Sequence, residues 1–270
     1  MSATVFIDGE VGTTGLQIRE RLGNRADLSF LSLDENERKD LGRRGDMLNA
    51  ADIVILCLPD EAAREAVAMI ENSDVRVIDA SSAHRVTDGW VYGMPEYGPG
   101  QAEKIAAASR VTNPGCYAIS SVSILHPLIA GGIVPASHPV TINAISGYSG
   151  GGKQMIADFE NAENGAYANT PFRVYGLGLA HKHVPEIKVR SGLDRPPLFV
   201  PSVGHFHQGM IVQVPLQLWA LPGNVSVGDI HAALEDHYAG QRFVKVRPLA
   251  ETADMSGLEP EALNGTNELH

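Results

Sequence analysis

The stretch TVFIDGEVGTTG, residues 4–15, decides the fold because it joins a short β-prone run to a glycine-rich turn. Residues 16–22 then indicate a helix, with Leu16, Arg19 and Leu22 spaced for one face. A strand, a glycine loop and a helix in this order form the setting in which a dinucleotide pyrophosphate is held. The spacing is GxxGxxG instead of GxGxxG, which is a weak signal by itself, and a glycine loop without a ligand is the alternative.

Further β-prone runs alternate with helical segments along the first half of the chain. Strands are expected at residues 28–33, 53–58, 75–79 and 110–113, and an Ala-rich helix at 61–70. Near-continuous apolar strands that alternate with helices indicate a parallel sheet covered on both faces. Residues 1–115 are therefore expected to form a doubly wound, Rossmann-type dinucleotide-binding domain.

The segment after the second expected strand bears on the choice between NAD and NADP. Asp34 lies where an acidic residue would accept a hydrogen bond from a ribose 2′-hydroxyl, which favours NAD. Arg38, Lys39, Arg43 and Arg44 follow closely and could instead bind a 2′-phosphate. The residues of this segment leave the choice open.

A polar run, DASSAHR at residues 79–85, comes where the strand at 75–79 ends. Open α/β sheets bind their ligands at this edge. The hydroxyls of Ser81 and Ser82 and the cation of Arg85 could therefore serve the cofactor or the substrate. The alternative is a helix N-cap and a surface cation.

A tight turn followed by a thiol, NPGCY at residues 113–117, comes after the last of these strands. Pro-Gly suits the centre of such a turn, and Ile119, Val122 and Leu125 mark one face of a helix that begins at Cys116. The first turn of a helix favours an anion, because its N–H groups lack intrahelical partners and it carries the positive end of the dipole. We therefore interpret Cys116 as a nucleophile at the same sheet edge as the glycine loop; the alternative is a buried small hydrophobe.

The pattern changes after Pro127, and residues 116–270 are expected to form an α+β catalytic domain with a largely antiparallel sheet. Strands are expected at residues 140–145, 210–218 and 243–246, and helices at 185–189 and 227–238, the second one capped by Ser226. The run SGYSGGGK at 146–153 lacks the spacing of a phosphate loop. A flexible loop that presents Lys153 to the substrate, or a plain linker, is expected there.

Two His-x-His pairs stand out in this second half, His181 with His183 and His205 with His207. A histidine of the first pair could be the acid–base partner of Cys116, because an imidazole titrates near neutral pH. Spacing does not separate His181 from His183, and His183 is the first choice. Clustered carboxylates and CxxC motifs are missing from the sequence around both pairs, so no metal site is expected.

The composition is that of an ordinary globular protein with an acidic balance. The 270 residues are 44% hydrophobic and 20% charged, with a formal net charge of −11. This charge argues against nucleic acid or an anionic membrane as a partner. No apolar run approaches the length of about 18 residues that suggests a membrane span, and the N-terminus lacks a signal-peptide pattern. Two cysteines, with Cys57 expected in the core, indicate a reducing compartment, and cytoplasm is expected.

Taken together, these segments resemble the N-acetyl-γ-glutamyl-phosphate reductases of the shorter bacterial type, NADPH-dependent enzymes of arginine biosynthesis. The matching segments are FIDGE with GTTG, CLPD, DASS with HR, GMPE, NPGCY, HKH with PE, and GTN, at residues 6–15, 57–60, 79–85, 93–96, 113–117, 181–186 and 265–267. The resemblance implies reduction of N-acetyl-γ-glutamyl phosphate to the semialdehyde and phosphate through a thioester on Cys116, with His183 or His181 as the acid–base group. It also implies a homo-oligomer, a dimer or a tetramer.

The resemblance further implies NADP instead of NAD. The cofactor-binding residues expected on this basis and from the glycine loop are Gly9, Gly12, Thr13, Thr14, Gly15, Ser81, Ser82 and Arg38. An acidic protein must bind an anionic substrate with local cations, and Arg85, Lys153 and Lys182 are the candidates.

The end of the chain departs from the family pattern. The family continues with a strand and an Asn-Leu-Gly-Lys-Gly segment that opens a helix returning to the cofactor domain, whereas this sequence stops at His270. A fragment, or a protein that lacks part of its cofactor wall, is expected. Two other functions stay open: an aspartate-semialdehyde dehydrogenase-like reductase of another acyl phosphate, and a truncated, non-catalytic dinucleotide-binding module.

Overall fold

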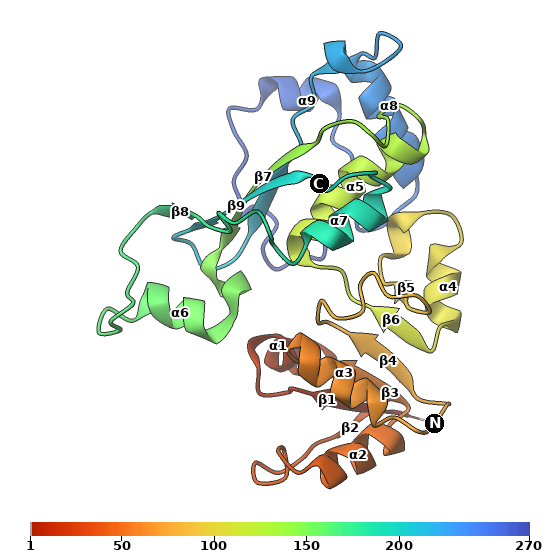
Figure 1. Ribbon diagram of the computed structural model, residues 1–270, viewed down its shortest axis with the longest axis vertical. Helices are drawn as coiled ribbons and strands as arrows, with labels where there is room; N and C mark the ends of the chain where they lie inside the picture. Colours follow the sequence, from red (N-terminus) through yellow and green to blue (C-terminus); the bar gives the residue numbers. More distant parts are fainter. Residues whose placement is uncertain (1) are drawn as a thin grey trace. The chain divides into compact units, whose positions relative to one another are not determined.

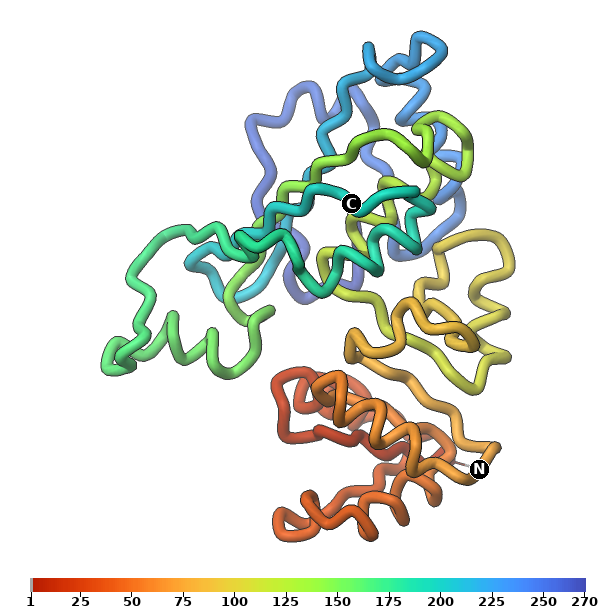
Figure 2. The backbone as a smooth tube through the Cα atoms, viewed as in Figure 1, coloured from red at the N-terminus to blue at the C-terminus, as the bar shows by residue number. Residues whose placement is uncertain are grey.

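The computed structural model describes residues 2–270, which form two compact units (Figure 1). Unit 1 runs to Pro95 and resumes over Gly100–Gly115, and unit 2 holds Glu96–Pro99 and Cys116–His270. Figure 2 traces the path of the backbone through both units. Tyr97 holds the segment Glu96–Pro99 in unit 2. Its ring stacks on that of His126, with 4.0 Å between the centroids, and its hydroxyl donates to the carbonyl oxygen of Arg190 at 2.7 Å.

Unit 1 is built on a six-stranded sheet in which every paired strand is parallel to its neighbour. The spatial order is β2-β1-β3-β4-β6-β5. The strands are β1 (Ala3–Asp8), β2 (Leu28–Leu31), β3 (Ile53–Leu56), β4 (Arg76–Asp79), β5 (Val91–Tyr92) and β6 (Arg110–Thr112). The direction of winding reverses between β1 and β3, which is the point where doubly wound sheets bind their ligands. The expected Rossmann-type sheet is confirmed.

Helices cover both faces of this sheet. They are α1 (Thr13–Leu22), α2 (Leu41–Ala50), α3 (Asp60–Ala68) and α4 (Gln101–Ala107), with a 3-10 turn, η1, at Pro95–Tyr97. Val5, Ile7 and Ile55 pack with Ile18 and Leu22 of α1 on one face. The alternate strand residues, among them Phe6, Val54 and Leu56, pack with α2 and α3 on the other face. This alternation follows from the two-residue period of a strand.

Two details of unit 1 differ from the sequence-based expectation. The helix α1 begins three residues before Leu16, and Leu16 is 52% exposed, so the predicted inward stripe through Leu16 is wrong. Gly15, Ile18 and Leu22 face inward instead, because a close approach of Gly15 to the backbone of Gly9 sets the rotation of the helix. Helix α2 is not among the predicted elements, because its segment is mostly polar. It is stabilised at its start by Asp40, whose carboxylate accepts a hydrogen bond from the backbone N of Arg43.

Unit 2 contains a mixed sheet of four strands in the order β10-β7-β9-β8. The strands are β7 (Thr141–Gly147), β8 (Phe172–Val174), β9 (Leu198–Gly204) and β10 (Met210–Gln213). The pairs β10–β7 and β8–β9 are antiparallel, and the central pair β7–β9 is parallel. The expected α+β class is confirmed, and the sheet is mixed, because the pairing at its centre is parallel.

The helices of unit 2 are α5 (Cys116–Ala130), α6 (Gly152–Glu160), α7 (Val184–Ser191), α8 (Val227–Tyr238) and α9 (Leu249–Asp254), with 3-10 turns η2 (Tyr148–Gly151) and η3 (Leu218–Ala220). Helices α5 and α7 share a core with the sheet, in which Ala118 and Leu125 meet Ile142, Ile187 and Phe199. Across the described residues, 2–270, we find no helix with the length and apolar character needed to cross a bilayer.

Helix α8 begins and ends where the sequence predicts. The Ser226 hydroxyl accepts a hydrogen bond from Asp229 N at 3.2 Å, and the Asp229 carboxylate accepts one from Ser226 N at 2.8 Å. This reciprocal capping box satisfies two N–H groups that a helix start otherwise leaves without partners.

Three expectations for unit 2 are wrong. Residues 146–153 are not a flexible loop: they complete β7 and continue into η2 and α6, because the backbone N–H groups of Tyr148 and Ser149 donate to the carbonyls of Phe206 and His207. Residues 243–246 form only a bridge between Val244 and Leu269 instead of a strand. The strand expected to reach Leu218 ends at Gln213.

Candidate active site

The glycine loop of unit 1 is a tight turn that only glycine can make. Gly9 has φ +90°, and its carbonyl accepts a hydrogen bond from Gly12 N at 2.9 Å. A Cβ on Gly9 would lie 2.3 Å from the carbonyl oxygen of Cys57, and one on Gly15 would lie 2.4 Å from that of Gly9. The first turn of α1, which starts with Thr13 and Thr14, is uncharged. The turn therefore presents a helix N-terminus that can approach a phosphate group closely.

Two of the four cations that follow β2, Arg43 and Arg44, are paired with carboxylates. The guanidinium of Arg44 is buried and lies 2.7 Å from the carboxylate of Asp8, the residue just before the glycine loop. Arg43 pairs with Glu37 at 2.9 Å. Arg38, the residue predicted to bind the cofactor, is exposed, as is Asp34. The structure thus leaves Arg38 at the surface of unit 1 and fixes Arg44 beneath the loop.

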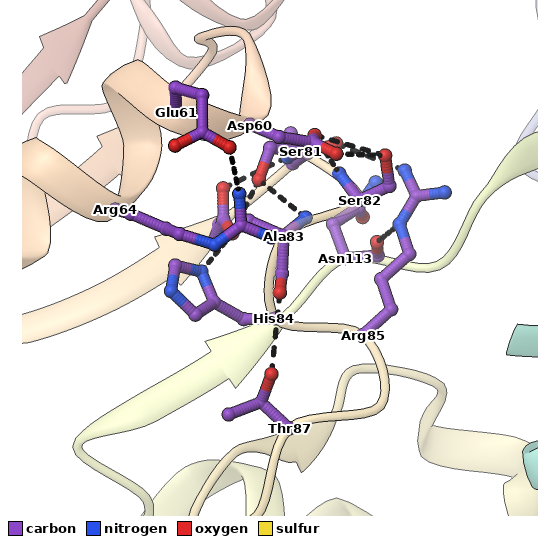
Figure 3. A network of polar contacts seen from close by, with 12 residues as sticks. Asp60, Glu61, Arg64, Ser81, Ser82, Ala83, His84, Arg85, Thr87 and Asn113 are labelled. Carbon is purple, nitrogen blue, oxygen red and sulfur yellow. Dashed lines mark hydrogen bonds and ion pairs between the residues drawn. The ribbon is translucent and has the colours of Figure 1, made fainter. Parts of the chain in front are cut away.

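The run at residues 79–85 forms a dense polar network at the carboxyl end of β4 (Figure 3). The buried carboxylate of Asp79 accepts from the Ser81 hydroxyl at 2.7 Å and lies 2.6 Å from Nδ1 of His84. The Ser82 hydroxyl and backbone N–H both donate to Asp60, the first residue of α3, at 2.9 Å. Both serine hydroxyls therefore donate to carboxylates of unit 1, and these hydrogen bonds hold the loop in its conformation.

Arg85 is not the surface cation that was one of the two expectations. Its side chain is buried, with the residue 6% exposed. Its guanidinium donates to the carbonyl oxygen of Asn113 at 3.2 Å, beside which Figure 3 draws it, and to that of Ala80 at 3.0 Å. Arg85 thereby ties the end of β4 to the turn that follows β6.

Cys116 is the first residue of α5, as the sequence predicts, and it is exposed. The neighbouring residues of the first turn, Tyr117 and Ala118, are buried and uncharged. A thiol in this position feels the positive end of the helix dipole, which favours the thiolate. The expectation of a buried small hydrophobe is therefore wrong for Cys116.

Two phenols lie beside this thiol. The Tyr117 hydroxyl is 2.7 Å from the Ser146 hydroxyl, donates to the carbonyl oxygen of Ser202 at 3.1 Å, and accepts from the Tyr175 hydroxyl at 3.1 Å. Burial is the main cause that raises the pKa of Tyr117 and of Tyr175, and the charge of Cys116 adds to it in both cases. Both phenols therefore stay protonated at neutral pH.

The histidine pair at 181 and 183 packs on the same phenol. The ring of Tyr117 lies 6.0 Å from that of His181 and 5.8 Å from that of His183, and the two imidazoles are 4.7 Å apart. Nδ1 of His181 accepts a hydrogen bond from the backbone N of His183 at 3.1 Å. Burial, followed by the charge of exposed Lys182, lowers the pKa of His181, so this ring is neutral at neutral pH and carries its proton on Nε2.

Comparisons with known proteins agree on one family. The chain matches two family models, "Semialdehyde dehydrogenase, NAD binding domain" over residues 9–106 and "Semialdehyde dehydrogenase, dimerisation domain" over 116–270. It is 54% identical to N-acetyl-gamma-glutamyl-phosphate reductase 2 of Pseudomonas putida and 55% identical to N-acetyl-gamma-glutamyl-phosphate reductase of Burkholderia ambifaria. In each case the match spans 98% of this chain and 84% of the relative. The chain belongs to the N-acetyl-γ-glutamyl-phosphate reductase family.

Solved structures of a neighbouring enzyme share the fold. Aspartate semialdehyde dehydrogenase from Francisella tularensis superposes with a TM-score of 0.65 at 13% identity, covering 98% of this chain and 88% of that one. The Vibrio cholerae enzyme complexed with ASA gives 0.61 at 15% identity, covering 91% and 81%. At such identities the likeness concerns the fold alone. It confirms the fold class expected from the sequence for this member of the reductase family.

Within unit 2 the structure brings together only part of the residue set that the sequence suggests for a reductase of this family. Cys116, Tyr117 and the 181/183 imidazoles form one cluster with Tyr175, whereas Lys153 lies exposed on α6. Neither tyrosine carries a predicted role from the sequence alone. Tyr117 could have been found as the buried neighbour of the thiol, but the sequence gives no signal that Tyr175 lies beside it, because this contact depends on chain folding over 58 residues.

The second cysteine of this family member has a different environment. Cys57 follows β3 and is partly buried beside the glycine loop. Burial, with smaller contributions from Asp79 and Asp8, raises its pKa to about 11. The Cys57 thiol is therefore protonated and unreactive at neutral pH. Within residues 2–270, groups of three or more His, Cys, Asp or Glu side chains placed to hold a metal ion are absent.

Proposed function

We propose that this chain catalyses the NADPH-dependent reduction of N-acetyl-γ-glutamyl phosphate to N-acetylglutamate 5-semialdehyde and phosphate, a step of arginine biosynthesis. Relatives that share more than half of its residues over 98% of its length carry the name of this reductase. The observation that supports the chemistry is the exposed thiol of Cys116 at a helix start, next to a phenol that contacts two imidazoles. An aspartate-semialdehyde substrate is supported only by fold likeness at 13 to 15% identity.

The residues of unit 1 fit a nicotinamide dinucleotide. Gly9 and Gly15 leave no room for a side chain, so the backbone of the loop can approach a pyrophosphate at the start of α1. We assign Gly9, Gly12, Thr13, Thr14 and Gly15 to this group, with Ser81 and Ser82 shaping the adjoining loop. NADP is proposed over NAD by analogy with the family. When bound, this cofactor supplies the hydride.

Cys116 is proposed to act as the nucleophile. Its thiolate attacks the carbonyl carbon of the acyl phosphate, a carbon–sulfur bond forms, and the carbon–oxygen bond to phosphate breaks, which releases phosphate and leaves a thioester. The N–H groups at the start of α5 stabilise the thiolate, and they also stabilise the oxygen that becomes negative during the attack. Lys182, Lys153 and Arg85 are the cations proposed for the substrate's phosphate and carboxylate.

His183 is proposed as the acid–base group, with His181 as its positioning neighbour. An acid that protonates the developing oxyanion needs a proton to give, and the lowered pKa of His181 leaves that ring neutral. Nδ1 of His181 is already held by the backbone of His183. Tyr117 and Tyr175 keep their protons and donate them to Ser202 and Tyr117, and their rings pack beside the imidazoles.

Replacing His183 by asparagine is expected to lower kcat by roughly 10²- to 10⁴-fold and to remove one limb of the pH–rate profile. The matched variant His181→Asn is expected to lower kcat less and to retain both limbs, because it removes a positioning contact. Steady-state kinetics between pH 5.5 and 9 provide the measurement. A His181 variant that loses the limb while the His183 variant keeps it reverses the assignment.

The reaction itself is tested in the reverse direction with two semialdehydes. Phosphate-dependent reduction of NADP⁺ is measured with N-acetylglutamate 5-semialdehyde and with aspartate semialdehyde. We expect kcat/KM to favour the acetylated substrate by about 100-fold or more. A site that hydrogen-bonds the acetamide group leaves those polar groups unpaired when the substrate carries a free amine instead. The opposite ratio supports the aspartate-semialdehyde reading, and NADPH binding without turnover of either substrate supports a non-catalytic module.

Assembly and compartment are proposed on separate grounds. The family model that matches residues 116–270 is described as a dimerisation domain, which supports a homo-oligomer, a dimer or a tetramer. The two cysteines, Cys57 and Cys116, both lie in the described part of the chain, and both are free thiols. This thiol state and the biosynthetic relatives support the cytoplasm.

A further inference from the structure

A carboxylate of the glycine loop is held between two side chains of unit 1. One oxygen of Glu10 lies 3.2 Å from Nε of Arg19 in α1. Its other oxygen accepts a hydrogen bond from the hydroxyl of Ser32, also at 3.2 Å. The Arg19 and Glu10 side chains are 38% and 25% exposed, and Ser32 is exposed, so the contact lies at the surface of unit 1, where a ligand can reach it. Arg19 and Ser32 therefore make a binding position for an anion, and Glu10 fills it.

Arg19 has more binding capacity than Glu10 uses. Its guanidinium carbon lies 3.9 Å from the centroid of the Phe30 ring, so the group is held over this ring. Its NH1 atom is buried and has no hydrogen-bond partner among residues 2–270. A guanidinium offers five N–H donors, and a buried donor without an acceptor is costly. An anion with more acceptor oxygens than one carboxylate would satisfy Arg19 better.

The position of this pair in the sheet indicates which anion it suits. Ser32 is the first residue after β2 (Leu28–Leu31). In a Rossmann-type sheet, the end of the second strand receives the 2′ position of the adenosine ribose. A phosphate at that position would meet the Ser32 hydroxyl and the Arg19 guanidinium, which are the groups that Glu10 now engages.

We infer that Arg19 and Ser32 form the binding site for the 2′-phosphate of NADP, and that Glu10 occupies it as an internal competitor when the cofactor is absent. This inference rests on the proposed use of NADP. It moves the role of the phosphate-binding cation from exposed Arg38 to Arg19. Glu10 has to leave the site when the dinucleotide binds, so part of the binding free energy is spent on breaking its contacts.

The test measures the dissociation constants of NADPH and NADH by the change in nicotinamide fluorescence on binding. Arg19→Met is expected to weaken NADPH binding by roughly 10- to 100-fold while NADH binding changes by less than about threefold, because only NADPH carries the phosphate. Glu10→Gln is expected to tighten NADPH binding several-fold, because the competing charge is gone. Arg21→Met, which removes an exposed cation from the same helix, is the matched control and is expected to leave both constants unchanged. Thermal unfolding checks that each variant is folded.

Three outcomes overturn the assignment. If Arg38→Met weakens NADPH binding more than Arg19→Met does, the phosphate belongs to Arg38. If Glu10→Gln weakens NADH binding and does not tighten NADPH binding, Glu10 is an acceptor for the ribose hydroxyl. If wild type binds neither dinucleotide, both this inference and the proposed function fail. A wild-type protein that binds NADPH in an Arg19-dependent way but reduces neither acyl phosphate supports the inference and overturns the function alone.

Discussion

Replacing Cys116 by serine is expected to reduce reductase turnover on the order of 10³-fold or more, while the dissociation constant of NADPH stays unchanged. A serine hydroxyl at the start of α5 does not ionise near neutral pH, so it cannot attack the acyl phosphate as a thiolate does. The exposed position of Cys116 means that the substitution removes little packing. The loss should therefore lie in kcat, with the unfolding free energy close to that of wild type.

The second cysteine supplies the matched control for this experiment. Cys57→Ser removes a thiol whose pKa is raised to about 11, so turnover should stay within about twofold of wild type. Alkylation with iodoacetamide at pH 7 should modify Cys116 and spare Cys57, and intact-protein mass should show the acyl adduct only where Cys116 is present. Normal turnover in Cys116→Ser, or preferential alkylation of Cys57, would contradict the nucleophile assignment.

Replacing Gly9 by alanine is expected to remove dinucleotide binding and to destabilise unit 1. The new Cβ would lie 2.3 Å from a backbone oxygen of Cys57, so either β3 or the loop has to shift. The left-handed conformation at φ +90° costs about 1–2 kcal/mol for a residue with a Cβ, and the overlap adds about 1–3 kcal/mol. Urea unfolding and NADPH titration measure the two effects.

Gly89→Ala separates the two causes. Gly89 has φ +82°, but its Cβ would project into open space, so only the conformational cost remains. We expect Gly89→Ala to lower the unfolding free energy by about 1–2 kcal/mol and to leave NADPH affinity unchanged. Equal effects of the two substitutions on binding would show that close packing of the loop against Cys57 is not what shapes the dinucleotide site.

Elements whose determinants are local could be predicted from the sequence. Helix α8 begins at Val227 because Ser226 and Asp229 cap it within four residues, and α5 begins at Cys116 because Pro114 and Gly115 end the preceding strand. The parallel sheet follows from apolar runs that alternate with helices. In each of these cases the signal lies in the segment itself.

Features that depend on distant contacts could not be predicted. The glycines at 147 and 150–152 suggest flexibility, yet hydrogen bonds to Phe206 and His207 order this segment into η2 and α6. Arg85 reads as a surface cation, but the carbonyls of Ala80 and Asn113 draw its guanidinium inward. Likewise, the contact between Tyr117 and Tyr175 arises only when α5 and the segment after β8 pack on one sheet.

The residues around Tyr97 limit how the gene can be divided. A cut after Gly115 would leave the N-terminal product with a tyrosine whose ring and hydroxyl have lost their partners, His126 and Arg190. The C-terminal product would expose one face of that imidazole and a helix carbonyl to water. A chimaera that takes unit 2 from a homologue therefore has to include residues 96–99 of that homologue as well as residues 116–270, which means two inserted segments instead of one.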